Sequence, residues 1–408
     1  AGLEQVLQFL ETIEFTKEEV EWLAGTGRLD RRLLDYLSAF RFTGDVHAMP
    51  EGTPFFQNEP ILRITAPIPQ AQLIETRLIN LLHYQVLVAS KAVRTVLAAG
   101  PSGKLLVDFG LRRAHGAEAG LLGARAAYLA GFSGSSNVLA EREFGIPAYG
   151  TMAHSFIQAF DDESSAFESF AVAQPQNVVL LIDTYDTEAG AKKTAALAHR
   201  LKRMGIQIKA VRLDSGNLGG LAHRVRRIFD KGGLPEIGIF ASGNLDEHIV
   251  GDLIRSGAPI DGFGIGTRLL TSSDAPYLDC AYKLQEYAGK PRRKRSTGKA
   301  TWPGRKQVYR YYDRKGEMRH DVLTLEDDAR AGVAKLIRPY MLSGKRVGPP
   351  VPLSESRARA ASELTRLPRN LRQLTSMPPY PVKVSSSLRA LARWVDKTSS
   401  EVSKRDRT

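Results

Sequence analysis

Cysteine is almost absent from this sequence, because Cys280 is the only one among 408 residues. A single thiol excludes an internal disulfide framework, a CxxC redox motif and a zinc site built from several thiolates. The apolar runs are only as long as strands, and the N-terminal stretch carries Glu4 and Glu11 where a signal peptide would be apolar. We therefore expect a cytoplasmic protein with no membrane partner.

Acidic residues are too few to balance the basic ones, since 57 Lys and Arg against 44 Asp and Glu give a formal charge of +13. Nine basic residues and no acidic residue lie between Lys290 and Arg310, and a second basic region lies in the C-terminal tail. The aromatic interleaving, zinc-finger spacing and RNP motif of nucleic-acid-binding proteins are missing. We therefore expect no nucleic-acid partner. A basic segment that contacts the phosphates of a nucleotide explains the excess of Lys and Arg better.

The first part of the chain, residues 1–100, is predicted to form an α+β domain. Its first 37 or so residues favour helices, and Thr16 with Glu19 has the spacing of a capping box. Short apolar pieces in 41–70 indicate strands, and three- and four-residue apolar steps from Gln70 to Ala99 indicate a helix.

The middle of the chain, residues 101–278, alternates short apolar runs with helical stretches. Such strands, bracketed by helices, indicate a parallel sheet covered on both faces. Polar residues follow many strand ends and no GxGxxG opens the first turn, so an irregular α/β barrel is favoured over a Rossmann sheet. The predicted strand segments are KLLVDFG (104–110), IPAYGT (146–151), VVLLIDT (178–184), IKAVRLDSG (208–216), IGIFASG (237–243) and IDGFGIGT (260–267).

The last part, residues 279–408, loses this rhythm. The segments 282–289 and 306–313 alternate like strands and are expected to return to the N-terminal domain, which makes that α+β domain discontinuous. From about Lys397 the basic tail is expected to fray.

Polar side chains at the strand ends are the candidates for chemistry. His154 has small neighbours that leave its imidazole accessible, although a buried structural histidine is the plain alternative. Asp183 and Asp186 follow a buried strand, where an unpaired carboxylate is costly. Asp183 could hold the tautomer of an imidazole, whereas Asp186 is expected to cap the next helix.

Arg212 and Asp214 alternate on one strand, so both side chains point to the same face. The guanidinium suits a carboxylate or phosphate, and the carboxylate suits ribose hydroxyls or magnesium; a mutual salt bridge is the alternative. Gly243, Gly264 and Gly266 follow late strands, where backbone amides could close around a phosphate or simply form tight turns.

Eight motifs, in order along nearly the whole chain, resemble those of the nicotinate phosphoribosyltransferases. This resemblance implies an irregular α/β barrel, a β-rich domain formed from both chain ends, and a homodimer with shared active sites. The motifs are DFGLRRAHG, FSGSSNV, YGTMAHSF, LIDTYDT, VRLDSGNL, ASGNLDE, GFGIGT and KRSTGKATWPGRKQVYR.

The resemblance also implies the reaction. Nicotinate and phosphoribosyl pyrophosphate would give nicotinate mononucleotide and pyrophosphate, the first step of NAD synthesis from nicotinate. Magnesium would assist, at ligands that the sequence does not identify. ATP hydrolysis would be coupled through a phosphohistidine, which places the enzyme among the ligases.

Residue roles follow from the same matching. His154 would carry the phosphoryl group, Asp183 would orient that imidazole, and Thr151 and Arg212 would contact nicotinate. Arg112 would line the base or pyrophosphate site. The residues that would hold the phosphoribosyl group are Asp214, Ser215, Gly216, Ser242, Gly243, Asn244, Gly264, Gly266 and Thr267. Those that would face ATP or phosphate are Lys294, Lys299, Arg305 and Lys306.

Ser136 bears on the choice of base. The nicotinamide-using relatives carry an aspartate at this position, where a carboxylate would repel nicotinate, so serine favours the acid. A nicotinamide or quinolinate phosphoribosyltransferase is the nearest alternative, and a non-catalytic barrel that binds nucleotides or RNA is a distant one. Family members also carry an upstream tyrosine expected to stack on nicotinate across the dimer; the sequence in hand starts at Ala1, past that point, so no such residue is assigned.

Overall fold

The computed structural model of the protein describes residues 1–375 and 377–405. The chain forms two compact units. The central unit comprises residues 84–278 with 372–375, and the terminal unit comprises residues 1–83, 279–371 and the described part of 376–408. The first boundary falls between residues 83 and 84, within helix α5 (Glu75–Ala99), and so lies ahead of the boundary expected at residue 100.

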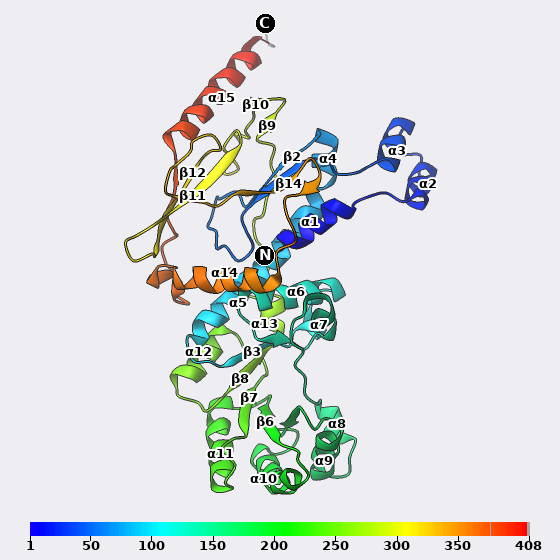
Figure 1. Ribbon diagram of the computed structural model, residues 1–408, viewed down its shortest axis with the longest axis vertical. Coiled ribbons are helices and arrows are strands. Elements are labelled where there is room, and N and C mark those ends of the chain that lie inside the picture. The colour runs from blue at the N-terminus through cyan, green and yellow to red at the C-terminus, as the bar shows by residue number, and fades with distance from the viewer. Residues whose placement is uncertain (376, 406–408) are drawn as a thin grey trace. The chain divides into compact units, whose positions relative to one another are not determined.

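A six-stranded parallel sheet forms the centre of the central unit (Figure 1). Its strands have the order β4-β3-β8-β7-β6-β5 and curl into a half-barrel, which confirms the predicted α/β class. The strands are β3 (Leu105–Asp108), β4 (Gly134–Ser135), β5 (Val178–Leu181), β6 (Ile208–Leu213), β7 (Gly238–Ala241) and β8 (Gly262–Ile265).

The strand predicted over 146–151 is wrong, because only an isolated bridge between Ala148 and Ser135 forms there. Pro147 has no amide hydrogen to give to a ladder, although its carbonyl accepts from Ser135 N at 3.1 Å. The segment therefore runs as a loop along the edge of β4.

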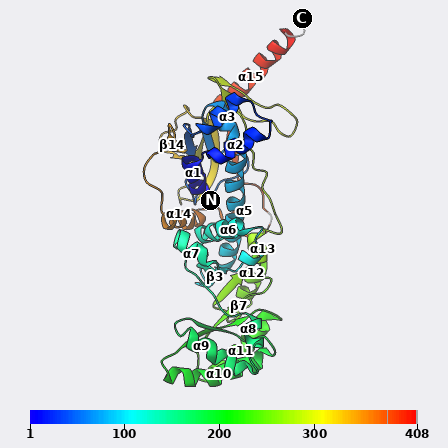
Figure 2. The ribbon, with the colours of Figure 1, turned by 90° about the vertical axis from the view of Figure 1, so that its right-hand side faces the viewer.

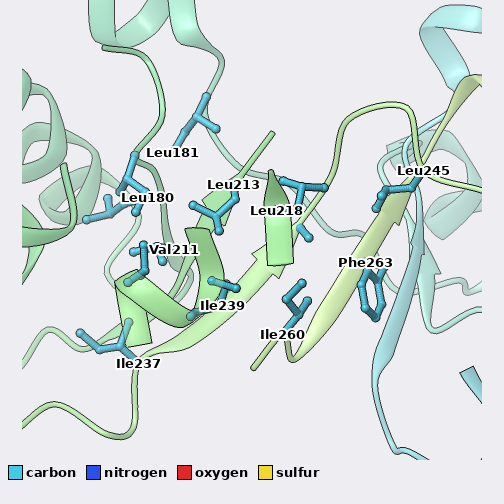
Figure 3. Close-up of a cluster of buried hydrophobic side chains, with 14 of the residues drawn as sticks. Leu180, Leu181, Val211, Leu213, Leu218, Ile237, Ile239, Leu245, Ile260 and Phe263 are labelled. Atoms are coloured by element: carbon cyan, nitrogen blue, oxygen red, sulfur yellow. The ribbon is translucent and has the colours of Figure 1, made fainter. Parts of the chain in front are cut away.

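Apolar side chains of the strands pack with those of the surrounding helices into one buried cluster (Figure 3). Val211, Ile239 and Phe263 come from three neighbouring strands and are almost fully buried. Helices α9, α10 and α11 lie close together, with α10 packed on both of the others (Figure 2). The remaining bounds are η1 (Leu111–Arg113), α6 (Ala117–Ala130), α7 (Val138–Phe144), α8 (His154–Gln158), α9 (Glu163–Ala173), α10 (Thr187–Arg203), α11 (Leu218–Lys231), α12 (Glu247–Arg255) and α13 (Thr267–Leu270).

The terminal unit joins segments from both chain ends, which confirms the predicted discontinuous α+β domain. In one sheet, of order β15-β14-β1-β2, Val46 of β1 pairs with Met341 of β14. A second sheet has the order β13-β11-β12-β16, and β9 and β10 form a hairpin. The strands are β1 (Asp45–Ala48), β2 (Leu62–Thr65), β9 (Glu286–Tyr287), β10 (Lys290–Pro291), β11 (Lys306–Tyr312), β12 (Met318–Leu325), β13 (Ala334–Lys335), β14 (Arg338–Leu342), β15 (Lys345–Arg346) and β16 (Val382–Val384).

Helices complete the terminal unit. The capping box predicted from Thr16 and Glu19 is confirmed at the start of α2. The strand predicted over 282–289 is shorter than expected, since a turn with positive φ at Ala288 and Gly289 follows β9. The tail is expected to fray from about residue 397, but helix α15 continues to Arg405. Residues 406–408 lie outside the described residues. The helices are α1 (Leu3–Thr12), α2 (Lys17–Gly25), α3 (Arg31–Ser38), α4 (Ile68–Leu73), α14 (Leu353–Thr365), η2 (Arg369–Arg372) and α15 (Ser386–Arg405).

Across the described residues, no helix combines the length and the apolar character needed to cross a bilayer.

Candidate functional site

His154 is the first residue of α8, and its side chain is 40% exposed. Its Nδ1 atom lies 3.1 Å from Thr184 Oγ1. Its Nε2 atom lies 3.7 Å from Asp214 Oδ2 and 3.9 Å from Asp183 Oδ1. Nε2 therefore faces two carboxylates that follow neighbouring strands.

The Asp183 side chain, by contrast, is almost fully buried. Its Oδ2 atom accepts hydrogen bonds from the backbone N–H of Asp214 at 2.9 Å and from Ser215 Oγ at 2.6 Å. Its Oδ1 atom is buried and makes no hydrogen bond within the described part of the chain. Asp183 thus ties the end of β5 to the end of β6, and the imidazole hydrogen bond that we considered for it is made by Thr184.

Arg212 makes three hydrogen bonds at the end of β6. Its guanidinium donates to Ser242 Oγ at 2.7 Å, to Thr151 Oγ1 at 3.0 Å and to Asp214 Oδ1 at 2.7 Å. The guanidinium carbon also lies 5.3 Å from the centre of the Phe109 ring. The mutual salt bridge with Asp214, considered as the alternative, is present, and the same side chain joins three loops.

Asp214 is kept in its charged form. Burial alone would raise the pKa of its carboxyl, but hydrogen bonds from Ser242 and Arg212 and the positive charge of Arg212 outweigh burial and hold that pKa below its usual range. The carboxylate therefore stays negative at neutral pH, beside the imidazole of His154.

The glycines at the later strand ends allow a close approach of backbone segments. Gly243 has φ +94, and a Cβ atom there would lie 1.9 Å from the carbonyl oxygen of Asp214. At Gly264 a Cβ atom would lie 2.6 Å from the Phe109 ring. Asn244 also has a positive φ of 51, while Gly266 precedes α13, which begins at Thr267. Larger side chains at Gly243 or Gly264 would displace residues that contact Arg212 or Asp214.

The remaining predicted residues of the central unit have fewer contacts. Arg112 is exposed in η1. Ser136 is half-buried and donates its backbone N–H to the carbonyl of Asp108 at 2.8 Å. Asp186 caps α10 by accepting from Ala189 N at 2.7 Å, which confirms the predicted cap.

Sequence reasoning missed three residues of this site: Thr184, Phe109 and Asp108. Asp108 is fully buried, and burial raises the pKa of its carboxyl to about 6, against hydrogen bonds from Ser135 and Gly110. Its position at the end of an apolar strand is the signal that could have identified it. Thr184 and Phe109 carried no comparable signal, because their roles depend on contacts with distant segments.

The predicted ATP-facing residues belong to the terminal unit. Lys294 and Lys299 are exposed, and Arg305 forms ion pairs with Glu286 at 3.5 Å and Glu326 at 3.8 Å. Lys306 is buried, and its Nζ atom donates to the carbonyl of Trp302 at 2.7 Å and of Gly304 at 2.9 Å. Burial and the charge of Arg63 lower the pKa of Lys306 to about 7.

No group of three or more His, Cys, Asp or Glu side chains is arranged to hold a metal ion within the described ranges 1–375 and 377–405.

Three family models match the chain in succession. The model of the nicotinate phosphoribosyltransferase N-terminal domain matches residues 1–83, that of the nicotinate phosphoribosyltransferase family matches residues 105–295, and that of the C-terminal domain matches residues 329–392.

Individual relatives cover almost the whole chain. A nicotinate phosphoribosyltransferase of Mycobacterium tuberculosis is 46% identical over 390 residues, which are 95% of this chain and 83% of that protein. The nicotinate phosphoribosyltransferase of Bos taurus is 32% identical, over 96% of this chain and 88% of its own length. The crystal structure of human nicotinic acid phosphoribosyltransferase is similar with a TM-score of 0.86 at 30% identity, over 97% of this chain and 91% of the human chain.

A second solved structure is also similar to the chain. The nicotinate-nucleotide pyrophosphorylase of Pyrococcus furiosus is similar with a TM-score of 0.68 at 30% identity, over 80% of this chain and 81% of that chain.

Proposed function

The chain belongs to the nicotinate phosphoribosyltransferase family, and we propose that it transfers the phosphoribosyl group of phosphoribosyl pyrophosphate to the ring nitrogen of nicotinate, in NAD synthesis. Membership of an enzyme family argues against the non-catalytic barrel that we considered. The observation that supports the proposal most directly is the hydrogen-bonded group of Thr151, Arg212, Asp214 and Ser242 beside the exposed imidazole of His154.

Arg212 and Thr151 are proposed to hold nicotinate. A guanidinium has five N–H donors, and the three hydrogen bonds that Arg212 makes with described residues leave two donors for a carboxylate. The pyridine nitrogen carries no proton, so its attack on the ribose requires no general base. Placing the carboxylate on Arg212 therefore orients the ring without a proton-transfer group.

Asp214 and the glycine loops are proposed to hold the phosphoribosyl group. Breaking the bond to pyrophosphate develops positive charge on the ribose, which a carboxylate that stays ionised stabilises. Backbone amides near Gly243, Asn244, Gly264 and Gly266 would bind the ribose phosphate, because they lie at the ends of β7 and β8, where loops of such barrels commonly bind phosphate. Ser215, Gly216, Ser242 and Thr267 complete the proposed set, with Arg112 at the base or pyrophosphate.

His154 is proposed to accept a phosphoryl group from ATP. Its Nδ1 atom faces Thr184, so Nε2 is the nitrogen left for phosphorylation. Asp183 and Asp214, within 4 Å of Nε2, would stabilise positive charge on the imidazole. We retain Lys294, Lys299 and Arg305 as ATP contacts, whereas the Lys306 ammonium, bound to two carbonyls, is better suited to shaping the loop before β11.

Magnesium is proposed to arrive with the substrate. This ion commonly uses one or two carboxylates and several phosphate oxygens in place of an all-protein cage, which agrees with the donors present. The Oδ1 atom of Asp183, buried without a hydrogen bond among the described residues, is the carboxylate oxygen best suited to hold it. Bound there, the ion would neutralise charge on the departing pyrophosphate.

We further propose a homodimer with shared active sites and, because the chain has a single cysteine, a cytoplasmic location. Nucleic acid is not a proposed partner. In the basic segment, Arg305 is paired with two glutamates and Arg293 with Asp396, which reduces the charge available to a polyanion.

Two experiments test the function. Turnover of nicotinate, nicotinamide and quinolinate is compared at equal concentrations with phosphoribosyl pyrophosphate and ATP; we expect nicotinate to be preferred, as Ser136 indicates, and a preference for nicotinamide would contradict that assignment. Mass spectrometry after incubation with ATP and magnesium is expected to find acid-labile phosphate on His154, and modification elsewhere would contradict its role.

A further inference from the structure

Asp108 is a buried carboxylate that the proposed mechanism does not use. It ends β3 and has no exposed surface. In the sheet, β8 separates β3 from β7, which Ser242 follows, and β8 and β7 together separate β3 from β6, which carries Arg212. Burying a carboxylate is costly unless hydrogen bonds compensate, so its partners show what the position requires.

One oxygen of Asp108 holds the loop that carries Ser136. Ser135 Oγ donates to Asp108 Oδ2 at 2.7 Å and accepts from the backbone N–H of Asn137 at 3.0 Å. The backbone N–H of Ser136 donates to the Asp108 carbonyl at 2.8 Å. Ser136, the residue proposed to select the base, is therefore held through its own backbone N–H and through its neighbour Ser135. Asp108 accepts both of these hydrogen bonds.

The other oxygen holds the turn that follows β3. The backbone N–H of Gly110 donates to Asp108 Oδ1 at 2.8 Å. This turn carries Phe109, whose ring lies 5.3 Å from the guanidinium carbon of Arg212, and leads into η1 with Arg112. The same carboxylate thus fixes a side chain against which the nicotinate-binding arginine packs.

We propose that Asp108 is a positioning residue for base recognition, which holds Ser136 and the Phe109 turn in the geometry that accepts nicotinate. This inference rests on the proposed function of Arg212 and Ser136. Asp108 is directed at the protein and not at a substrate, so its loss should weaken binding of the base and leave the phosphoribosyl site intact.

The ionised form of Asp108 is the one that serves both loops. Each oxygen of the carboxylate accepts from a donor. A proton on Oδ1 would break the bond from Gly110 N, and a proton on Oδ2 would reverse the bond with Ser135 Oγ, which already accepts from Asn137 N. Burial raises the pKa of this carboxyl to about 6. The titratable group that faces it is Tyr84 of α5, and burial also raises the pKa of Tyr84, which therefore stays neutral in this range.

The test is steady-state kinetics of Asp108→Asn in the full chain. We expect the KM for nicotinate to rise roughly tenfold, while kcat and the KM for phosphoribosyl pyrophosphate change less than about threefold, because a small displacement of a binding group acts on the base alone. In the wild-type enzyme the nicotinate KM should rise as pH falls below about 6. This rise should be absent in Asp108→Asn, which cannot ionise.

Two further variants keep the test decisive. Ser135→Ala removes one donor and should raise the nicotinate KM in the same direction, even if Asp108→Asn does not fold. Ser133→Ala is the matched control and should change no constant, because within the described residues the Ser133 hydroxyl accepts one long bond of 3.4 Å, from Leu106 N. An unchanged nicotinate KM in Ser135→Ala or in folded Asp108→Asn would overturn the inference, as would an equal loss of kcat with every base. A wild-type enzyme that transfers to no base would overturn the proposed function itself.

Discussion

Arg212 Nη1 donates a hydrogen bond of 3.0 Å to Thr151 Oγ1, across 61 residues of sequence. This bond joins the end of β6 to the loop before α8, so the guanidinium and the imidazole-bearing helix are held in one arrangement. A change at Arg212 therefore acts on residues of both segments.

Replacing Arg212 with lysine should raise the KM for nicotinate about a hundredfold, because a point-charged ammonium cannot reach three protein acceptors and a carboxylate at once. Steady-state kinetics with varied nicotinate would measure this. Arg200→Lys on α10, an exposed ion pair with Glu168, is the control and should have no effect. Equal KM values for the two variants would contradict the assignment of Arg212 to the base.

Replacing His154 with alanine should abolish nicotinate-stimulated ATP hydrolysis and leave some transferase activity, because Arg212 and Asp214 keep their bonds to each other and to Ser242. Parallel assays of phosphate release and nucleotide formation would separate the two activities. His199→Ala, at an exposed position on α10, is the matched control. Undiminished ATP hydrolysis in His154→Ala would refute the phosphohistidine role.

Gly264→Ala should lower both stability and activity. The added methyl group would lie 2.6 Å from the Phe109 ring, which in turn contacts Arg212. Overpacking of this kind costs about 1–3 kcal/mol. Thermal unfolding and the nicotinate KM would be compared with those of Gly25→Ala, at the end of α2, where nothing lies within 4 Å. If Gly264→Ala matched that control, the close approach of Gly264 and Phe109 would be unimportant.

Glu59 should make stability fall with rising pH. Burial, followed by a hydrogen bond and charge repulsion from Asp321, raises the pKa of Glu59 from 4.5 to about 9. Between these values the folded state holds a proton that the unfolded state has released, so the free energy of unfolding decreases by at most about 1.4 kcal/mol per pH unit. The stability is fully present below pH 4.5 and is lost as pH rises through about 9.

Chemical denaturation of Glu59→Gln at several pH values between 5 and 9 is the measurement. The variant should lose less stability than the wild type as pH rises, because glutamine has no proton to release. Parallel curves for the two proteins would show that Glu59 is ionised in the folded state.

Much of the fold could be predicted because it depends on local patterns. Apolar runs of four to six residues predicted β3, β5, β6, β7 and β8. The residue types at Thr16 and Asp186 predicted two helix caps, because a cap bonds to a backbone N–H only a few residues away. The segment at 146–151 misled the same reasoning, because Pro147 within an apolar run prevents a regular ladder.

The sequence alone determined which chemical groups are available and the strand ends at which they stand, since the two-residue period of a strand places Arg212 and Asp214 on one face. Only the tertiary structure decided that Thr184 engages His154, that Asp108 joins two loops and that the Lys306 ammonium binds backbone carbonyls. The His154–Thr184 bond joins residues 30 positions apart, the Asp108–Ser135 bond joins residues 27 apart and the Arg212–Thr151 bond joins residues 61 apart. No local pattern in the sequence predicts such contacts. Packing of the whole sheet brings these side chains within hydrogen-bond distance.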